Sequence, residues 1–422
     1  MAIAIATFLI ALAVIASDRI HRTKVALLGA AVVVLFISDF SQERAIEAVD
    51  FNTIGLLVGM MILVYLTQQT GVYDYVAIRA GQLSKGRPFA VVLSLAVTTA
   101  LLSAFLDNLT TILLIVPVTF LLADAFDIDP IPLIVIEILV SNIGGTATLI
   151  GDPPNIIIAG ATGLSFNSFI VNLAPIALLA FVVVTGLLYL WYRPQLQIDE
   201  KNRRYVMELD AEGSIRDAAE LRRTGPILVV TILAFFAHQA LHIEPATVAL
   251  SGAALALLVT KIDLEQAVSK IEWPTLFFFV ALFVMVGALE ETGAIGEAAD
   301  ALKSMTGGDR TAELMGTLWI SAIGSGIVDN IPFTAAMIPV VDELQRSGGE
   351  DDAYWWALSL GACFGGNATL IAAGANVAAA GLSERAGRPI GFVAFLKVGL
   401  PVTLVSLILA TGYVLVRYVV LN

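Results

Sequence analysis

The sequence has very little cysteine and histidine, and this scarcity excludes several kinds of site. Cys363 is its single cysteine, so the chain cannot close an internal disulfide bond. Its three histidines are His21, His238 and His242, and the one cysteine is remote from all of them in the sequence, so they do not make up the set of four ligands that a structural zinc site requires. We therefore expect no resident metal ion and no cofactor.

Charged residues are also scarce, at 14% of the chain, and their balance is acidic. The 23 Lys and Arg residues are outnumbered by 36 Asp and Glu residues, which gives a net charge of -13. Acidic residues gather in polar stretches such as 39–50, as is typical of solvated loops. An acidic chain repels a phosphate backbone, so we expect no binding to nucleic acid.

Hydrophobic residues, in contrast, make up 58% of the 422 residues, and the mean hydropathy is +0.88. A soluble core cannot bury that much apolar surface, so the chain is predicted to lie in a lipid bilayer. The first apolar run, Ile3 to Ala16, lacks the preceding basic residues and the following cleavage site of a signal peptide. We expect it to be retained as the first helix of a multi-pass protein of a bacterial or archaeal inner membrane.

Two halves of the chain resemble each other at a nearly constant offset. Residues 105–108, Phe-Leu-Asp-Asn, recur 222 positions later as Ile-Val-Asp-Asn at 327–330. Residues 144–150 recur 221 positions later at 365–371, sharing Gly-Gly and Ala-Thr-Leu-Ile. Generic membrane composition does not account for such motifs, so we predict an internal duplication. The predicted parts are an N-terminal repeat 1–192, a polar linker 193–224 and a C-terminal repeat 225–422.

Each repeat is predicted to cross the membrane five times. An apolar segment broken by Asp-Asn lies between the third and fourth spans of each repeat, at 89–123 and 312–341. An acid and an amide facing lipid would be costly, so these segments are predicted to be re-entrant hairpins. Five is an odd number of crossings, so the repeats must be inverted. The predicted spans lie near 3–17, 24–38, 52–69, 131–160, 170–192, 226–241, 246–260, 273–290, 354–380 and 392–417.

The fold class is therefore predicted as an all-α polytopic membrane protein with two inverted five-span repeats, each holding a re-entrant hairpin and a discontinuous helix. Basic residues give the orientation. A cytoplasmic linker places 18 of the 23 basic residues inside, Arg22 among them, and both termini outside. Two ordinary spans in place of each hairpin would make the halves parallel and weaken this bias.

Four broken segments hold the candidate site. Gly-Gly pairs at membrane depth free backbone groups, Pro153 and Pro154 fix the second half of one break, and helix ends then offer partial charges to a small ion. The candidate substrate- and ion-binding residues are Asp107, Asn108, Thr110, Thr111, Asn142, Gly144, Gly145, Thr146, Thr148, Asp152, Asn155, Asp329, Asn330, Gly365, Gly366, Asn367, Thr369 and Asn376.

Some of these residues also have a structural interpretation. A carboxylate within an apolar segment is functional by default, so Asp107 and Asp329 are predicted to couple transport to protons, with capping as the alternative. Asp152 fits equally well as the cap of the helix that Pro153 begins. Gly-Gly pairs also let helices pack closely. Glu137 is interpreted as a structural residue near the inner interface, and Cys363 as a packing residue or a substrate contact.

At these motifs the chain resembles the ion transporter superfamily, in the branch of the arsenite-efflux permeases, the NhaD-type sodium/proton antiporters and the P protein. The most specific match is 141–155, Ser-Asn-Ile-Gly-Gly-Thr-Ala-Thr-Leu-Ile-Gly-Asp-Pro-Pro-Asn, followed by 105–111 and 327–333. The resemblance implies a scaffold part, a transport part and a homodimer. For an arsenite permease it also implies a soluble ATPase subunit as a partner.

The tips of the two predicted hairpins, where Asp-Asn breaks each segment, differ in sequence from those of one branch of this superfamily. Divalent-anion/sodium symporters carry Ser-Asn-Thr there, whereas this chain carries Asp-Asn at both tips. Unit charges 4 Å apart interact by about 4 kcal/mol even at an effective dielectric of 20, so two aspartates disfavour di- and tricarboxylates. Carboxyl groups withdrawn from water can exchange protons near neutral pH, which suits a neutral or cationic substrate.

We therefore predict a secondary active transporter rather than an enzyme, acting as a proton-coupled antiporter in the efflux of arsenite or antimonite and thus in arsenic resistance. Arsenite is uncharged and presents hydroxyls, while a thiolate cage for arsenic is excluded by the single cysteine. The alternatives are sodium/proton antiport, with Na+ as the coupling ion, and P-protein-like anion transport. A passive channel is less favoured, as is an intramembrane protease, whose Gly-x-Gly-Asp pattern is missing.

Overall fold

The computed structural model describes residues 1–17, 19–348 and 351–421, and within these ranges it contains helices and no strand. Six of the described helices are long and apolar enough to cross a membrane. They are α4 (Phe51–Gln68), α6 (Pro88–Leu106), α7 (Asn108–Phe126), α10 (Phe166–Tyr192), α15 (Trp273–Glu291) and α21 (Phe392–Leu415). The predicted class, an all-α polytopic membrane protein, is confirmed.

Two predicted spans are broken in the middle, as the Gly-Gly motifs indicate. The span near 131–160 divides into α8 (Ile131–Gly145) and α9 (Pro153–Thr162), and the span near 354–380 into α19 (Ala353–Gly365) and α20 (Gly374–Arg385). Pro153 is tolerated as the first residue of α9 because the first turn of a helix has no use for its missing N–H.

The helices follow one another in the same order in both halves of the described chain. The series α1 to α10 and the series α12 to α21 each hold five helices, a two-helix hairpin, a two-piece helix and a long final helix. This order follows the duplication seen in the sequence, whose inverted character stays a prediction. The remaining helices are α1 (Ala2–Ala16), α2 (Arg22–Phe36), α3 (Gln42–Glu47), α5 (Val72–Leu83), α11 (Glu200–Met207), α12 (Ala218–Ala237), α13 (Pro245–Val259), α14 (Leu264–Ser269), α16 (Ala294–Thr306), α17 (Arg310–Ile327) and α18 (Asn330–Gly348).

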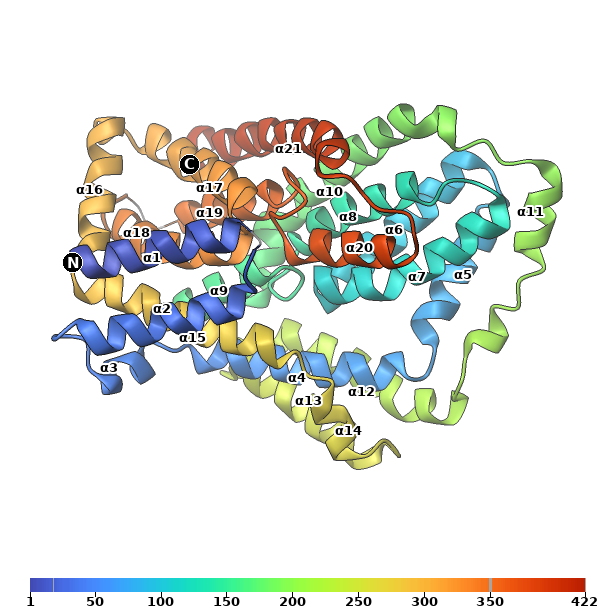
Figure 1. Ribbon diagram of the computed structural model, residues 1–422, viewed down its shortest axis with the longest axis horizontal. Helices are drawn as coiled ribbons and strands as arrows, with labels where there is room; N and C mark the ends of the chain where they lie inside the picture. The colour runs from blue at the N-terminus through green and yellow to red at the C-terminus, as the bar shows by residue number, and fades with distance from the viewer. Residues whose placement is uncertain (18, 349–350, 422) are drawn as a thin grey trace.

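The two hairpins approach the middle of the molecule from opposite ends. The hairpin α6–α7 lies with α5 and α11 toward the right of Figure 1, and the hairpin α17–α18 lies with α16 toward the left. The second piece of each broken helix packs beside the hairpin of the other half, α9 against α18 and α20 against α7. Such a crossed arrangement is what an inverted duplication requires.

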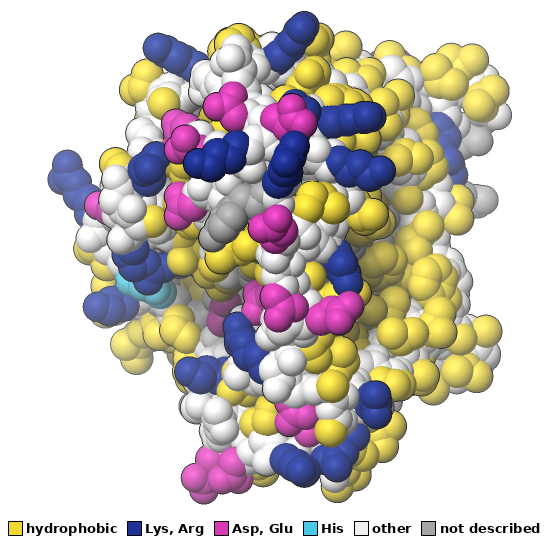
Figure 2. Space-filling model, turned by 90° about the vertical axis from the view of Figure 1, so that its right-hand side faces the viewer, with side chains coloured by type: hydrophobic (Ala, Val, Ile, Leu, Met, Phe, Trp, Pro, Cys, Tyr) yellow, Lys and Arg dark blue, Asp and Glu magenta, His cyan; other side chains and the backbone are white. Residues whose placement is uncertain are grey.

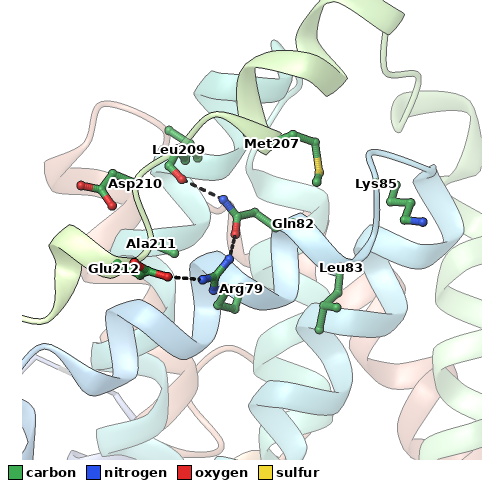
Figure 3. Close-up of a pocket in the computed structure, with 9 residues that line it drawn as sticks. All are labelled: Arg79, Gln82, Leu83, Lys85, Met207, Leu209, Asp210, Ala211 and Glu212. Carbon is green, nitrogen blue, oxygen red and sulfur yellow. Dashed lines mark hydrogen bonds and ion pairs between the residues drawn. The ribbon is translucent and has the colours of Figure 1, made fainter.

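The linker lies at the polar end of the molecule. Its last residues, from Ala218, already belong to α12, and the rest forms α11 and two short 3-10 turns. Figure 2 views this end and shows Lys, Arg, Asp and Glu side chains gathered over it. Figure 3 shows how the linker is held on α5: the Gln82 amide donates to the Leu209 carbonyl at 2.8 Å, and Arg79 pairs with Glu212 at 3.0 Å. Arg79 of α5 and the linker therefore lie together.

The first glycine of each Gly-Gly pair allows close contact between a broken helix and a hairpin arm. A Cβ atom on Gly144 would lie 2.4 Å from the carbonyl oxygen of Ala100 in α6. A Cβ atom on Gly365 would lie 2.5 Å from the carbonyl oxygen of Ala322 in α17. Both obstacles are backbone atoms, which cannot rotate away as a side chain can. The glycines therefore hold each break against its hairpin.

Replacing Gly144 or Gly365 by alanine is expected to destabilise the protein by about 1–3 kcal/mol, because the helices must separate to admit a methyl group. The measurement is thermal unfolding of the purified protein in detergent. Gly186→Ala in α10 is the matched control, since a Cβ atom there meets nothing within 4 Å. Alanine is also the better helix former, so the control should keep or slightly raise the midpoint. Equal midpoints for all three variants would contradict the packing role.

Candidate ion and substrate site

Hydroxyl groups tie both broken helices to the hairpin arms in the same way. A serine of each hairpin arm donates to a carbonyl of the broken helix, and a threonine of each break donates back to a carbonyl of the arm. The pairs are Ser103 to Ser141 at 2.6 Å, Ser325 to Ala362 at 2.7 Å, Thr369 to Gly326 at 2.8 Å, and Thr148 to Ala104. These bonds recur at the offset of the sequence repeat. The hydroxyls of Thr148 and Thr369 are therefore already hydrogen-bonded to backbone carbonyls.

Two asparagines satisfy the carbonyl groups that the breaks expose. The Asn155 amide donates to the carbonyls of Thr146 and Thr148 at 3.1 and 2.8 Å. The Asn376 amide donates to the carbonyls of Gly366 and Thr369 at 2.7 and 2.9 Å. Buried carbonyls without a partner are costly, and a side-chain amide supplies two donors. Both predicted site residues thus stabilise the breaks between the helix pieces.

Asp152 lies where the two hairpin tips meet. Its Oδ1 atom accepts hydrogen bonds from the Asn108 and Asn330 amides, both at 3.1 Å. The side chain is fully buried, and its Oδ2 atom has no partner among the described residues. It makes no capping bond to α9, so the capping interpretation is wrong. The buried, unpaired oxygen is an atom where a proton or a small cation would be held.

A chain of amides continues from Asp152 into the second half of the protein. Asn142 accepts from Asn108 at 3.0 Å and donates to Asn367 and Asn376 at 2.9 and 3.0 Å. All of these side chains are buried. One network therefore unites six of the predicted site residues from both repeats: Asn108, Asn142, Asp152, Asn330, Asn367 and Asn376.

The two tip aspartates share one hydrogen bond but differ in the partner of their second oxygen. Asp107 accepts from the backbone N–H of Thr110 at 2.8 Å, and Asp329 accepts from that of Ile331 at 2.9 Å. Each therefore caps the returning helix, so capping is part of its role. The second oxygen of Asp329 forms an ion pair with Arg22 at 2.8 Å. None of the ion pairs between described residues involves Asp107.

A cavity of about 30 Å³ lies between the tips. Arg22, Asp107, Asn108, Glu272 and Asn330 contribute to its lining. A cavity of this volume holds one or two water molecules. In this conformation, the space between the tips therefore fits a single ion or a very small solute.

Arg22 and Glu272 reach this cavity although neither was predicted as a site residue. The charge pattern predicts a cytoplasmic position for Arg22, whereas the structure pairs it with Asp329 and places its guanidinium 5.1 Å from the Phe278 ring centre. The repeat holds a signal that could have identified it. Pro245 stands at the corresponding position of the second half, so only one tip can have such a partner.

The other candidates lie around the network. Thr146 donates to the Asn142 carbonyl at 2.7 Å, and the buried Thr111 hydroxyl has no partner among the described residues. Gly145 packs against the carbonyl oxygen of Gly151. Cys363 lies 3.7 Å from the Asn155 side-chain oxygen, deep in the protein.

Glu137 is a buried residue of α8, and its position near the inner interface stays a prediction. Its side chain is fully buried between α7 and α8, and it accepts a hydrogen bond from Thr119 at 2.5 Å. Glu137 lies four residues before Ser141, the first residue of the motif 141–155, and is therefore inside the apolar part of α8. Sequence periodicity did not reveal this because α8 is buried on all sides.

Two hairpins that meet at buried carboxylates between two broken helices are an arrangement typical of membrane transporters. The chain belongs to the Citrate transporter (CitMHS) family, whose model matches residues 11–361. It is 44% identical over 425 residues to an uncharacterized transporter of Mycobacterium bovis, covering 99% of both chains. It is 33% identical over 494 residues to the human P protein, covering 97% of this chain and 59% of that protein.

The fold is also similar to that of a solved structure. The crystal structure of the YdaH transporter of Alcanivorax borkumensis matches with a TM-score of 0.60 at 18% identity, covering 90% of this chain and 87% of that one. The resemblance to the ion transporter superfamily and its P-protein branch is therefore confirmed. The protein is a multi-pass membrane transporter.

Proposed function

We propose that this protein is a secondary active antiporter that exchanges protons for a small uncharged or cationic solute, with arsenite or antimonite efflux as the first candidate. The observation that carries the proposal is the Asp152 carboxylate, buried between both hairpin tips with one oxygen unpaired. A group that both tips hold can change its proton or ligand when the tips move.

Arsenite fits the chemistry of these residues. It is uncharged, so the carboxylates of Asp107 and Asp152 do not repel it, and its hydroxyls can donate to carboxylate and amide oxygens. Citrate, which the family description names, fits less well. It would bring up to three negative charges next to these carboxylates, at about 4 kcal/mol for each pair of unit charges 4 Å apart at a dielectric of 20.

Sodium is the second candidate, and the oxygen atoms around Asp152 favour it. Hard cations prefer carboxylate, carbonyl and amide oxygens, and the network offers all three. Anion transport of the P-protein kind is less favoured. Arg22 is the one basic side chain among the described residues that line the cavity, and it is already paired with Asp329.

The proposal extends to the setting of the protein. The linker faces the cytoplasm of a bacterial or archaeal cell, both termini face outward, and the transporter works as a homodimer. The charged end that Figure 2 views supports a polar face on the linker side. A soluble ATPase subunit would be a partner only in arsenite efflux.

Proteoliposomes with an imposed pH gradient are expected to accumulate arsenite when the cytoplasmic side of the protein faces outward, as in inverted membrane vesicles. The measurement compares labelled arsenite with ²²Na+ at equal gradients, with protein-free liposomes as the control. Arsenite uptake that is insensitive to the pH gradient would overturn proton coupling. Uptake of ²²Na+ without arsenite uptake would establish the second candidate in place of the first.

A further inference from the structure

The two tips carry the same Asp-Asn pair but differ in charge. Asp329 is neutralised by Arg22, whose Nη1 atom lies 2.8 Å from its Oδ2 atom. Asp107 has no basic partner among the described residues, and it lines the cavity. Pro245 occupies the position that corresponds to Arg22, so the difference is built into the sequence. Two sites that the repeat makes alike are therefore unlike in what they can bind.

We infer that Arg22 is a tethered cation that occupies the ion site at Asp329 and so leaves the transporter with one mobile-cation site, at Asp107 and Asp152. Arg22 is thus a specificity-determining residue that sets how many cations the protein binds. The inference rests on the proposed function in that the bound cation drives transport, but the number of sites can be measured without transport.

The contacts of Arg22 show how the tether is held. Arg22 is the first residue of α2, which packs against α15, and the Phe278 ring of α15 lies 5.1 Å from its guanidinium carbon. The side chain of Asp329 is only 7% exposed, and that of Arg22 is 23% exposed. An arginine stays charged at every physiological pH, so protons cannot release it. A free cation would have to displace a partner that never leaves the protein.

The same contacts set the charge of the whole site. Asp107 and Glu272 line the cavity, and Arg22 is the one basic group among the described residues of the lining. Asp152 and Asp329 lie behind the lining, where Asp152 is bonded to Asn108 and Asn330 and Asp329 to Arg22. Arg22 pairs directly with Asp329, whereas Glu272 accepts a hydrogen bond from the Thr275 hydroxyl at 3.2 Å. Removing the guanidinium should therefore expose Asp329 first.

Equilibrium binding of ²²Na+ to the purified protein in detergent tests the inference. Arg22→Gln is expected to bind one more Na+ per chain than the unmodified protein. Arg22→Lys, which keeps a tethered charge, should bind the original number. In Arg22→Gln/Asp329→Asn the additional site should disappear. An unchanged count in Arg22→Gln, or an additional site that survives in the double variant, would overturn the inference.

A second comparison covers the case in which Arg22→Gln does not fold. Asp329→Asn leaves Arg22 charged and unpaired beside the remaining carboxylates, so Na+ should bind at least tenfold more weakly than to Arg22→Gln/Asp329→Asn. Equal affinities in these two proteins would overturn the inference as well. Neither readout uses arsenite or a pH gradient, so failure of the proposed function and failure of this inference remain distinguishable.

Discussion

Replacing Asp152 by asparagine is expected to abolish proton-driven transport and to leave the protein folded. Asparagine keeps one oxygen that can accept from Asn108 and Asn330, so the tips should still meet. It replaces the unpaired oxygen with an NH₂ group, which can hold neither a proton in exchange nor a cation. A neutral amide is also less costly to bury than a carboxylate.

The measurement for Asp152→Asn is the initial rate of arsenite and of ²²Na+ uptake into proteoliposomes at a fixed pH gradient. We expect a loss of at least about 100-fold, equivalent to about 2.7 kcal/mol. Asp124→Asn is the matched control, because Asp124 lies on α7, the hairpin arm that also carries Asn108, but is exposed. Transport by Asp152→Asn at the rate of this control would show that Asp152 is not part of the transport site. A lowered unfolding midpoint would instead mark it as a structural residue.

Asp107→Asn and Asp329→Asn are expected to lose coupled transport for different reasons. At Asp107 the backbone adopts a φ of 88°, and asparagine tolerates positive φ and caps helices as well as aspartate does. The variant therefore loses the charge and keeps the turn. At Asp329 the variant loses the partner of Arg22, so a positive charge enters the site.

Both variants are tested by measuring gradient-driven uptake into proteoliposomes. Both should fail in gradient-driven uptake, with unfolding midpoints close to that of the unmodified protein. Asp127→Asn is the matched control. Like Asp107, Asp127 has a positive φ, of 57°, and it lies exposed at the base of the hairpin that carries Asp107. Gradient-driven uptake at the control rate in both variants would refute the coupling role.

The sequence predicted local breaks well because their causes are local. Gly144 and Gly145 end a helix, Pro153 begins the next one, and Asp107 caps the return of the hairpin. Each effect depends on residues within a turn or two of the break. The same local information marked the candidate site, and most of its polar residues do gather at the breaks.

The sequence could not assign roles within the site. Asp152 fitted a helix cap as well as a ligand, and the choice depended on whether Asn108 and Asn330 would reach it. Glu137 was predicted to be structural, but no local pattern showed that α8 is enclosed by other helices. Both cases concern neighbours that are remote along the chain.

The sequence by itself therefore determined the class of the protein and the positions of its broken helices, since hydropathy and helix-breaking residues act over short stretches of chain. The tertiary structure alone decided which polar groups face one another. Arg22 and Asp329 are 307 residues apart, yet their side chains form the ion pair that makes the two tips unlike. Such a pairing is fixed by how α2, α15 and the second hairpin pack, because burial leaves a charged group no other partner.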